Sequence, residues 1–116
     1  MIRDFNYTVR DNVLLIQLNK DLDHHIAENI REKIDELIDD NDVKHLIIDF
    51  SNVSFMDSSG IGVIMGRYKK IRYADGNIAV IGINKMIDRI FNMSALYRIT
   101  LKCDDLQTAL KELNEI

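Results

Sequence analysis

Two short segments at the start of the chain alternate between apolar and polar residues. Phe5, Tyr7 and Val9 are separated by polar residues, which is the pattern of a half-buried strand. Residues 13–18 (VLLIQL) predict a second strand. Residues 10–12 (RDN) lie between them and contain Asp and Asn, which favour tight turns. The sequence therefore predicts an N-terminal β-hairpin.

The next segment follows a helical period. Apolar residues recur at helical spacing between positions 26 and 38, and charged residues fill the opposite face, as in an amphipathic helix. Asp21 and Asp23 are candidate N-caps for this helix. The acidic segment 39–42 is expected to end it, because acidic residues interact badly with the negative end of the helix dipole.

The middle of the chain predicts a buried strand followed by a second helix. Residues 46–50 are mostly apolar, as expected of a central strand covered on both faces. The polar residues 57–59 come next and precede the second helical pattern. The apolar positions of this second helix are Ile61, Ile64, Met65, Tyr68 and Ile71.

The C-terminal part continues the alternation of strands and helices. Residues 78–81 predict a strand, residues 86–91 a short helix, residues 99–101 a short edge strand and residues 106–113 a final helix. Strand–helix–strand units imply parallel pairing with right-handed crossovers. We therefore expect an α/β fold with a mixed sheet of four to five strands, an N-terminal hairpin and about four helices. The chain contains no proline and no linker-like segment, so residues 1–116 are expected to form a single domain.

Charge limits the kind of partner that the chain can bind. The formal net charge is -4, so no dominant basic stripe is available to neutralise nucleic-acid phosphates. We expect no nucleic-acid partner. The local basic segment 67–72 (RYKKIR) is typical of a solvated helix face, and a docking surface for an acidic partner is the alternative interpretation.

The remaining composition favours a cytoplasmic protein that does not bind a membrane. No apolar segment approaches the roughly 18 residues that a membrane span needs. The N-terminus lacks the apolar segment of a signal peptide. Cys103 is the sole cysteine, which excludes an intrachain disulfide and a cysteine-rich metal site.

Two adjacent hydroxyl groups, those of Ser58 and Ser59, stand at the expected start of the second helix. A serine in this position faces free backbone N–H groups and the positive end of the helix dipole. A phosphate there would add a charge of about -1.5 to -2 and would be tolerated by the helix. Ser58 is therefore a candidate charge switch. The alternative is that Ser58 and Ser59 only cap the helix.

Asp57 permits a different interpretation. An aspartate after a strand of a small α/β domain could accept a phosphoryl group, as in receiver domains. Such a site needs a pair of acidic metal ligands nearby, and residues 18–21 (LNKD) at the end of the second strand contain no contiguous acidic pair. The residues favour Asp57 as an N-cap or turn residue over a receiver-like phosphoacceptor.

The histidines and serines do not make a complete catalytic or metal-binding set. His24 and His25 are adjacent, and adjacent helical positions do not share a face, so they are poor joint metal ligands. His45 precedes a strand and is expected at the surface. Residues 56–60 (MDSSG) lack the first glycine of the G-x-S-x-G hydrolase motif. We predict no catalytic residue, no metal and no cofactor, and hence a protein that is not an enzyme.

Three glycines, Gly60, Gly62 and Gly66, lie within the second helical pattern. Each costs about 1 kcal/mol relative to Ala in a helix interior. Their spacing is one residue longer than the dinucleotide-binding fingerprint, and no Walker lysine follows. We expect them instead to allow close approach of the backbone to the sheet or to a partner.

Three segments of the chain resemble the STAS-domain anti-sigma factor antagonists: residues 22–25 (LDHH), 54–62 (SFMDSSGIG) and 91–96 (FNMSAL). The extension over residues 63–69 (VIMGRYK) resembles the sporulation-type members of that family. The resemblance covers essentially the whole chain. It departs from the family pattern at Lys20, where many members carry glycine.

The resemblance implies a function in partner switching. The unphosphorylated protein would bind an anti-sigma factor that is also a serine kinase, and would thereby free the sigma factor. The kinase would phosphorylate Ser58 and abolish binding, and a serine phosphatase would restore it. The residues that the resemblance places in the partner-binding site are Asp23, Asp57, Ser58, Ser59, Gly60 and Gly62.

Overall fold

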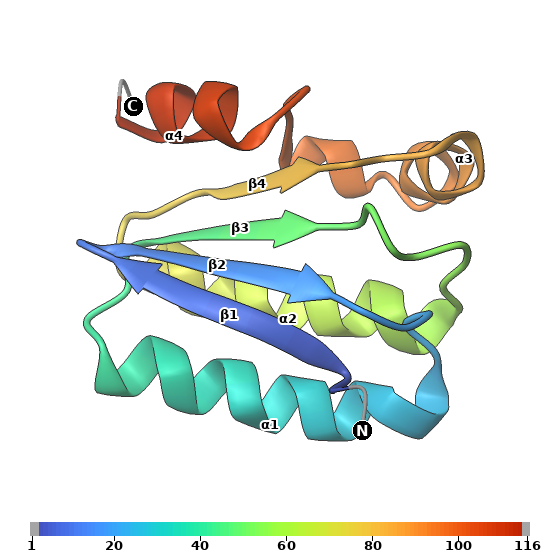
Figure 1. Cartoon of the computed structure of the whole chain (residues 1–116), viewed down its shortest axis with the longest axis horizontal. Helices are drawn as coiled ribbons and strands as arrows, with labels where there is room; N and C mark the ends of the chain where they lie inside the picture. The colour runs from blue at the N-terminus through green and yellow to red at the C-terminus, as the bar shows by residue number, and fades with distance from the viewer. Residues whose placement is uncertain (1–2, 115–116) are drawn as a thin grey trace.

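A mixed five-stranded sheet forms the centre of the described part of the chain (Figure 1). The computed structural model describes residues 3–114. The strands lie in chain order, with β1 antiparallel to β2 and the other neighbours parallel. Their bounds are β1 Phe5–Arg10, β2 Val13–Leu18, β3 His45–Asp49, β4 Ile78–Ile81 and β5 Leu101–Lys102. The predicted mixed sheet with an N-terminal hairpin is confirmed.

Within residues 3–114, four α-helices and one 3₁₀-helix connect and cover the strands. They are α1 His24–Asp40, α2 Ser58–Tyr73, α3 Lys85–Met93, η1 Leu96–Arg98 and α4 Leu106–Asn114. Buried residues of α1, α2 and α3 join one hydrophobic cluster on one face of the sheet, whereas those of α4 join a second cluster on the other face. Figure 1 shows α4 on the opposite side of the sheet from α1 and α2. Within residues 3–114, no helix has the length and apolar character needed to cross a membrane.

Alternation along β2 divides its side chains between the two clusters. Leu14, Ile16 and Leu18 are fully buried toward α1 and α2, because successive side chains of a strand point to opposite faces. Val13 joins the cluster that contains Ala109 of α4. β3 and β4 are covered on both faces, which explains why residues 46–48 of β3 and the whole of β4 are apolar without alternation.

His45 opens β3 and is buried, so the prediction of a surface histidine is wrong. Its Nδ1 accepts a hydrogen bond of 3.1 Å from the backbone N–H of Asn77, just before β4. Burial lowers the pKa of His45, and the charge of neighbouring Lys44 lowers it further. His45 therefore serves as a neutral acceptor that joins the starts of two neighbouring strands.

The buried face of α2 differs from the predicted one. Met65 is 48% exposed, whereas Arg67, predicted to lie on a solvated basic face, is only 6% exposed. Both predictions are wrong for one reason: α2 packs on α1 as well as on the sheet, so its buried stripe is turned toward α1, includes Arg67 and leaves Met65 outside. Sequence period alone does not reveal this second packing surface.

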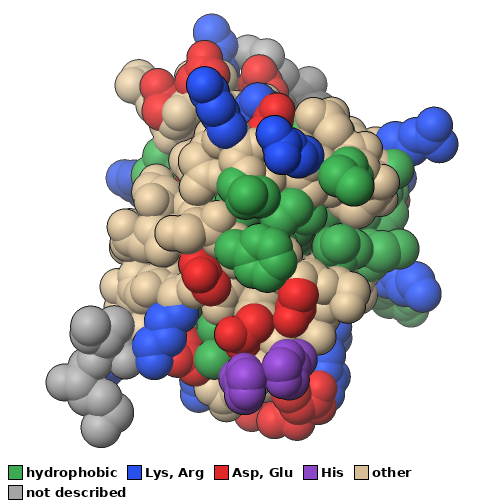
Figure 2. Space-filling view, turned by 90° about the vertical axis from the view of Figure 1, so that its right-hand side faces the viewer, with side chains coloured by type: hydrophobic (Ala, Val, Ile, Leu, Met, Phe, Trp, Pro, Cys, Tyr) green, Lys and Arg blue, Asp and Glu red, His purple; other side chains and the backbone are tan. Residues whose placement is uncertain are grey.

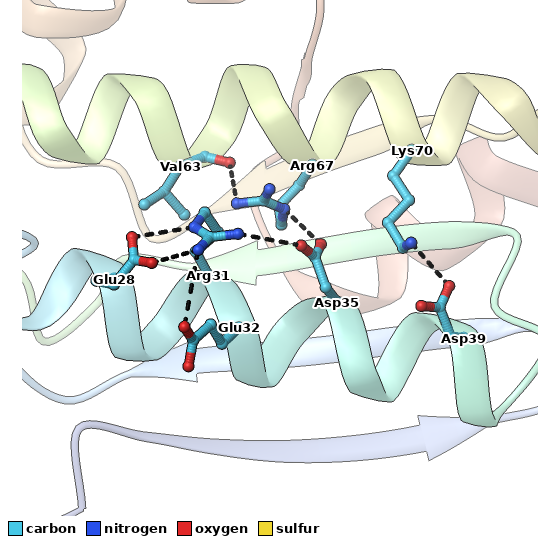
Figure 3. A network of polar contacts seen from close by, with 8 residues as sticks. All are labelled: Glu28, Arg31, Glu32, Asp35, Asp39, Val63, Arg67 and Lys70. Atoms are coloured by element: carbon cyan, nitrogen blue, oxygen red, sulfur yellow. Dashed lines mark hydrogen bonds and ion pairs between the residues drawn. The ribbon is translucent and has the colours of Figure 1, made fainter.

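Arg67 is stabilised in the interior by an ion pair between α2 and α1 (Figure 3). Its Nε lies 2.8 Å from Oδ1 of Asp35, and its Nη1 donates to the carbonyl oxygen of Val63 at 3.2 Å. Burial lowers the pKa of Arg67, and the facing Asp35 carboxylate partly offsets this. Arg31 extends the network along α1 by contacting Asp35 and Glu28.

We expect Arg67→Ala to lower the free energy of unfolding by about 2–3 kcal/mol, because it removes a buried charge-assisted contact and leaves Asp35 with only its longer, 3.9 Å contact to Arg31. Lys70→Ala is the matched control. Lys70 also pairs with α1, at 2.8 Å from Asp39, but this pair is largely exposed and should contribute less than about 1 kcal/mol. Denaturant unfolding of both variants measures the difference, and equal losses would contradict the assignment.

Candidate functional site

The loops that precede α1 and α2 run side by side at one edge of the sheet. The backbone N–H of Leu22 donates to the carbonyl oxygen of Phe55 at 3.3 Å, and that of Asp57 donates to the carbonyl oxygen of Leu22 at 3.3 Å. Leu22 and Met56 form an isolated parallel bridge. We call this region, residues 21–25 and 54–60, the corner. Parallel neighbours β2 and β3 end at the same edge, so the two helices that follow them begin together.

The Asp57 carboxylate contacts the N-termini of both helices. One oxygen accepts a hydrogen bond of 2.8 Å from the Ser59 N–H and caps α2, as predicted. The other accepts a hydrogen bond of 3.2 Å from the N–H of His24, the first residue of α1. Partial desolvation alone would raise the pKa of Asp57, but the hydrogen bonds from these N–H groups prevail and hold the pKa below its ordinary value.

Two further aspartates organise the other loop. Asp23 caps α1, since its side chain accepts a hydrogen bond of 2.9 Å from the His25 N–H. Asp21, the other predicted cap, instead accepts from the N–H groups of Ser54 at 2.7 Å and Phe55 at 3.2 Å. No local pattern reveals this role, because the donors lie more than thirty residues along the chain.

Ser58 is the first residue of α2 and is exposed, whereas Ser59 is partly buried. Because Asp57 supplies the cap, the alternative that the serines serve as caps is wrong. The Ser58 hydroxyl is thus left without a capping role. It lies at the surface, at the positive end of the α2 dipole.

The glycines of the corner have different surroundings. A Cβ on Gly60 would lie 2.8 Å from the carbonyl oxygen of Leu22 and 3.1 Å from Cβ of Met56. Gly60 therefore allows the two loops to pack on α2, and the close approach is internal to the protein. A Cβ on Gly62 would meet nothing within 4 Å, and this residue is exposed.

His24 and His25 lie together rather than on separate faces. Their ring centroids are 4.0 Å apart, so the expectation that adjacent residues point apart is wrong at this helix end. Nδ1 of His24 is 3.6 Å from the Asp57 carboxylate, and Nδ1 of His25 is 3.6 Å from that of Asp23. Among residues 3–114, no group of three or more His, Cys, Asp or Glu side chains is arranged to hold a metal ion.

The N-terminus of α3 is attached to the loop that carries Ser58. Asn84 caps α3, because its Oδ1 accepts a hydrogen bond of 2.9 Å from the Ile87 N–H. Its Nδ2 donates to the carbonyl oxygen of Val53 at 2.8 Å. All three helices on this face of the sheet therefore begin at the same edge.

An apolar groove lies beside Ser58. Its volume is about 400 Å³, and its lining consists of Met56, Asp57, Ser58, Ile61, Ile90, Met93 and Ser94. Figure 2 shows hydrophobic side chains gathered over the middle of this side of the molecule, with acidic side chains and histidines next to them. Sequence reasoning missed the groove, although the resemblance at residues 91–96 had marked the segment that contains Met93.

These features are those of a small α/β domain with an exposed serine at a helix N-terminus. The chain belongs to the STAS domain family, whose family model matches residues 4–110.

Two kinds of relatives agree with this assignment. An anti-sigma F factor antagonist from Paenibacillus polymyxa is 39% identical over 104 residues, covering 90% of this chain and 89% of the relative. The solved structure of the anti-sigma factor antagonist SpoIIAA in its unphosphorylated form matches with a TM-score of 0.84 and 29% identity, covering 97% of each chain. The phosphorylated form of the Bacillus SpoIIAA matches with a TM-score of 0.73 and 29% identity, covering 93% of this chain and 97% of that one.

We expect Gly60→Ala and Gly62→Ala to change stability in opposite directions. The first should lower the free energy of unfolding by about 1–3 kcal/mol, because the new methyl group overpacks the contact with Leu22. The second should raise it by up to about 1 kcal/mol, because Ala is the better helix former and meets open space. Thermal or denaturant unfolding of the pair tests this, and a stabilising Gly60→Ala would contradict the packing role.

The lowered pKa of Asp57 predicts a pH dependence of stability. A carboxylate with a folded pKa below its unfolded value stabilises the fold above that unfolded value, which for Asp57 is the ordinary 3.8. That contribution is lost as the pH falls through the lower, folded pKa. A carbon-13 NMR titration should place the Asp57 midpoint below the ordinary 3.8. Asp57→Asn, which retains a capping side chain, should remove this part of the pH dependence; a midpoint at or above 3.8 would contradict the prediction.

Proposed function

We propose that this protein is an anti-sigma factor antagonist of the sporulation type, switched by phosphorylation of Ser58. The observation that carries the proposal is the exposed, non-capping serine at the first position of α2, in a chain 39% identical to an anti-sigma F factor antagonist. The fold likeness to SpoIIAA in both its unphosphorylated and its phosphorylated form supports it.

In this proposal the unphosphorylated protein binds an anti-sigma factor through the corner, and the sigma factor is released. The residues assigned to this contact are Asp23, Asp57, Ser58, Ser59, Gly60 and Gly62. Gly62 and Ser58 are exposed and accessible to a partner. Gly60 is buried, and its part in binding is to hold the loops in place.

A phosphate on Ser58 acts locally in this proposal. It adds a charge of about -1.5 to -2 at a helix N-terminus, where the helix dipole favours it. The fold therefore changes little. The complex is weakened because a covering partner must remove water from the phosphate, and burying an unpaired charge is costly.

The switch requires a kinase and a phosphatase. The anti-sigma factor acts as the serine kinase, with ATP as phosphoryl donor, and a serine phosphatase removes the phosphate. The chain itself serves as substrate and binding module rather than as an enzyme, and needs no cofactor. The single-domain organisation of residues 1–116 and the cytoplasmic location remain predictions.

The receiver-like alternative would place the phosphate on Asp57. Both oxygens of that side chain accept backbone N–H groups, which supports the role of a cap. The two modifications are chemically distinct, because an acyl phosphate on Asp57 is cleaved by hydroxylamine and a phosphoserine is not.

We expect wild type and Ser58→Ala to bind the unmodified partner, and Ser58→Asp to bind at least about tenfold more weakly, equivalent to about 1.4 kcal/mol. Intact mass after incubation with the kinase and ATP should show one phosphate on wild type and none on Ser58→Ala. Ser59→Ala is the matched control and should still be phosphorylated. Equal affinity of wild type and Ser58→Asp would contradict the proposed function.

A further inference from the structure

β1 is the outermost strand on one side of the sheet, and its outer edge pairs with no strand of residues 3–114 (Figure 1). It pairs with β2 in unbroken register, so no bulge interrupts it. Its residues 5–9 (FNYTV) contain neither a proline nor a charged residue, which are common means of protecting an edge strand. The opposite edge strand, β5, is protected by its shortness, because it spans only Leu101–Lys102. β1 is therefore an open edge that can accept a further strand.

The hairpin determines which backbone groups of β1 point outward. The backbone N–H of Asn19 donates to the carbonyl oxygen of Asp4 at 2.9 Å, so these two facing residues form a hydrogen-bonded pair. Hydrogen-bonded and non-hydrogen-bonded pairs alternate along an antiparallel ladder. Residues 6, 8 and 10 therefore also direct their N–H and C=O groups toward β2. The N–H and C=O groups of Phe5, Tyr7 and Val9 point away from the sheet.

These outward groups are arranged symmetrically about Tyr7. If a second copy of β1 lies antiparallel to the first, Tyr7 can face Tyr7 of that copy, and Phe5 then faces Val9 at both ends. Each facing pair exchanges two hydrogen bonds, so every outward N–H meets an outward C=O. In the same register, Asp4 of one copy is level with Arg10 of the other, so the two strand ends also match in charge. The edge is thus complementary to itself.

The side chains on the α1 side of β1 provide apolar contact for such a pairing. Phe5 and Val9 pack against the hydrophobic core, whereas Tyr7 is 48% exposed. A groove of about 470 Å³ lies between β1 and α1, and its lining includes Phe5, Tyr7, Asn29 and Lys33. Tyr7 of a second copy would lie at the mouth of this groove, beside Tyr7 of the first.

We propose that β1 pairs with β1 of a second copy of this chain, antiparallel and with Tyr7 on the twofold axis. The two five-stranded sheets then join into one continuous sheet. One strand from each copy makes a small contact, of the class that gives weak and reversible association. No residue of the corner belongs to β1 or to the groove beside it. The pairing therefore leaves Ser58 accessible in both copies, and it does not depend on phosphorylation of that residue.

A cysteine on the twofold axis tests this register. The Cα atoms of a hydrogen-bonded pair lie about 5.5 Å apart, which a disulfide can span. Tyr7→Cys should form a disulfide-linked dimer on mild oxidation, in a Cys103→Ala background that lacks the sole native thiol. Thr8→Cys in the same background is the matched control, because Thr8 faces Asn6 of the second copy. Its own counterpart lies more than roughly 7 Å away, beyond the reach of a disulfide.

We expect Tyr7→Cys to give at least about fivefold more linked dimer than Thr8→Cys, as measured by non-reducing electrophoresis and intact mass. Denaturant unfolding under reducing conditions checks that both variants are folded. Equal linkage of the two variants, or linkage of Thr8→Cys alone, would overturn the proposed pairing.

Sedimentation equilibrium tests the pairing without added cysteines. Wild type should show a monomer–dimer equilibrium with a dissociation constant of about 0.1–1 mM. Tyr7→Lys places two like charges opposite each other and should weaken association at least about tenfold. Tyr73→Lys changes an aromatic residue that is 96% exposed on α2, and should leave the equilibrium unaltered. A wild type that stays monomeric at about 1 mM, or equal losses for the two lysine variants, would contradict the proposal.

Discussion

The Asp57 carboxylate is the contact on which the corner depends, because its two oxygens accept N–H groups from the first turns of two different helices. An N-cap side chain normally accepts hydrogen bonds from the first turn of a single helix. Here one side chain sets where α1 and α2 begin relative to each other. Asp21 accepts hydrogen bonds from the loop before Ser58, and these bonds hold that loop in place.

The sheet makes this contact possible, and the helix pair maintains it. Parallel strands deliver the helices that follow them to one edge, and the Arg67–Asp35 ion pair joins α1 and α2 farther along their length. The two helices are thus connected both at their starts and near their middles. Such a pair resists relative sliding of the two helices, which would keep the Ser58 hydroxyl in a constant position for the proposed switch.

The hydrophobic periodicity of the sequence predicted the hairpin, the mixed sheet and the helices, because each of these elements has a one-sided or fully buried pattern. It was insufficient where a residue faces a distant partner. Arg67 is buried because α1 lies across it, and His45 because Asn77 provides a donor. The corner was found through Asp57 and Ser58, which are local signals. The groove was missed because its walls come from helices that no sequence period brings together.

The N-termini of α1, α2 and α3 lie at one edge of the sheet, and this has a consequence for the stability of the phosphorylated form. Their dipoles produce a positive backbone potential, which the aspartates of the corner balance. A phosphate added on Ser58 would enter a region already adapted to negative charge. The energetic penalty of modification would then fall on the complex and not on the isolated protein. The two forms would be similarly stable, so the same molecule could pass repeatedly through modification and recovery without unfolding.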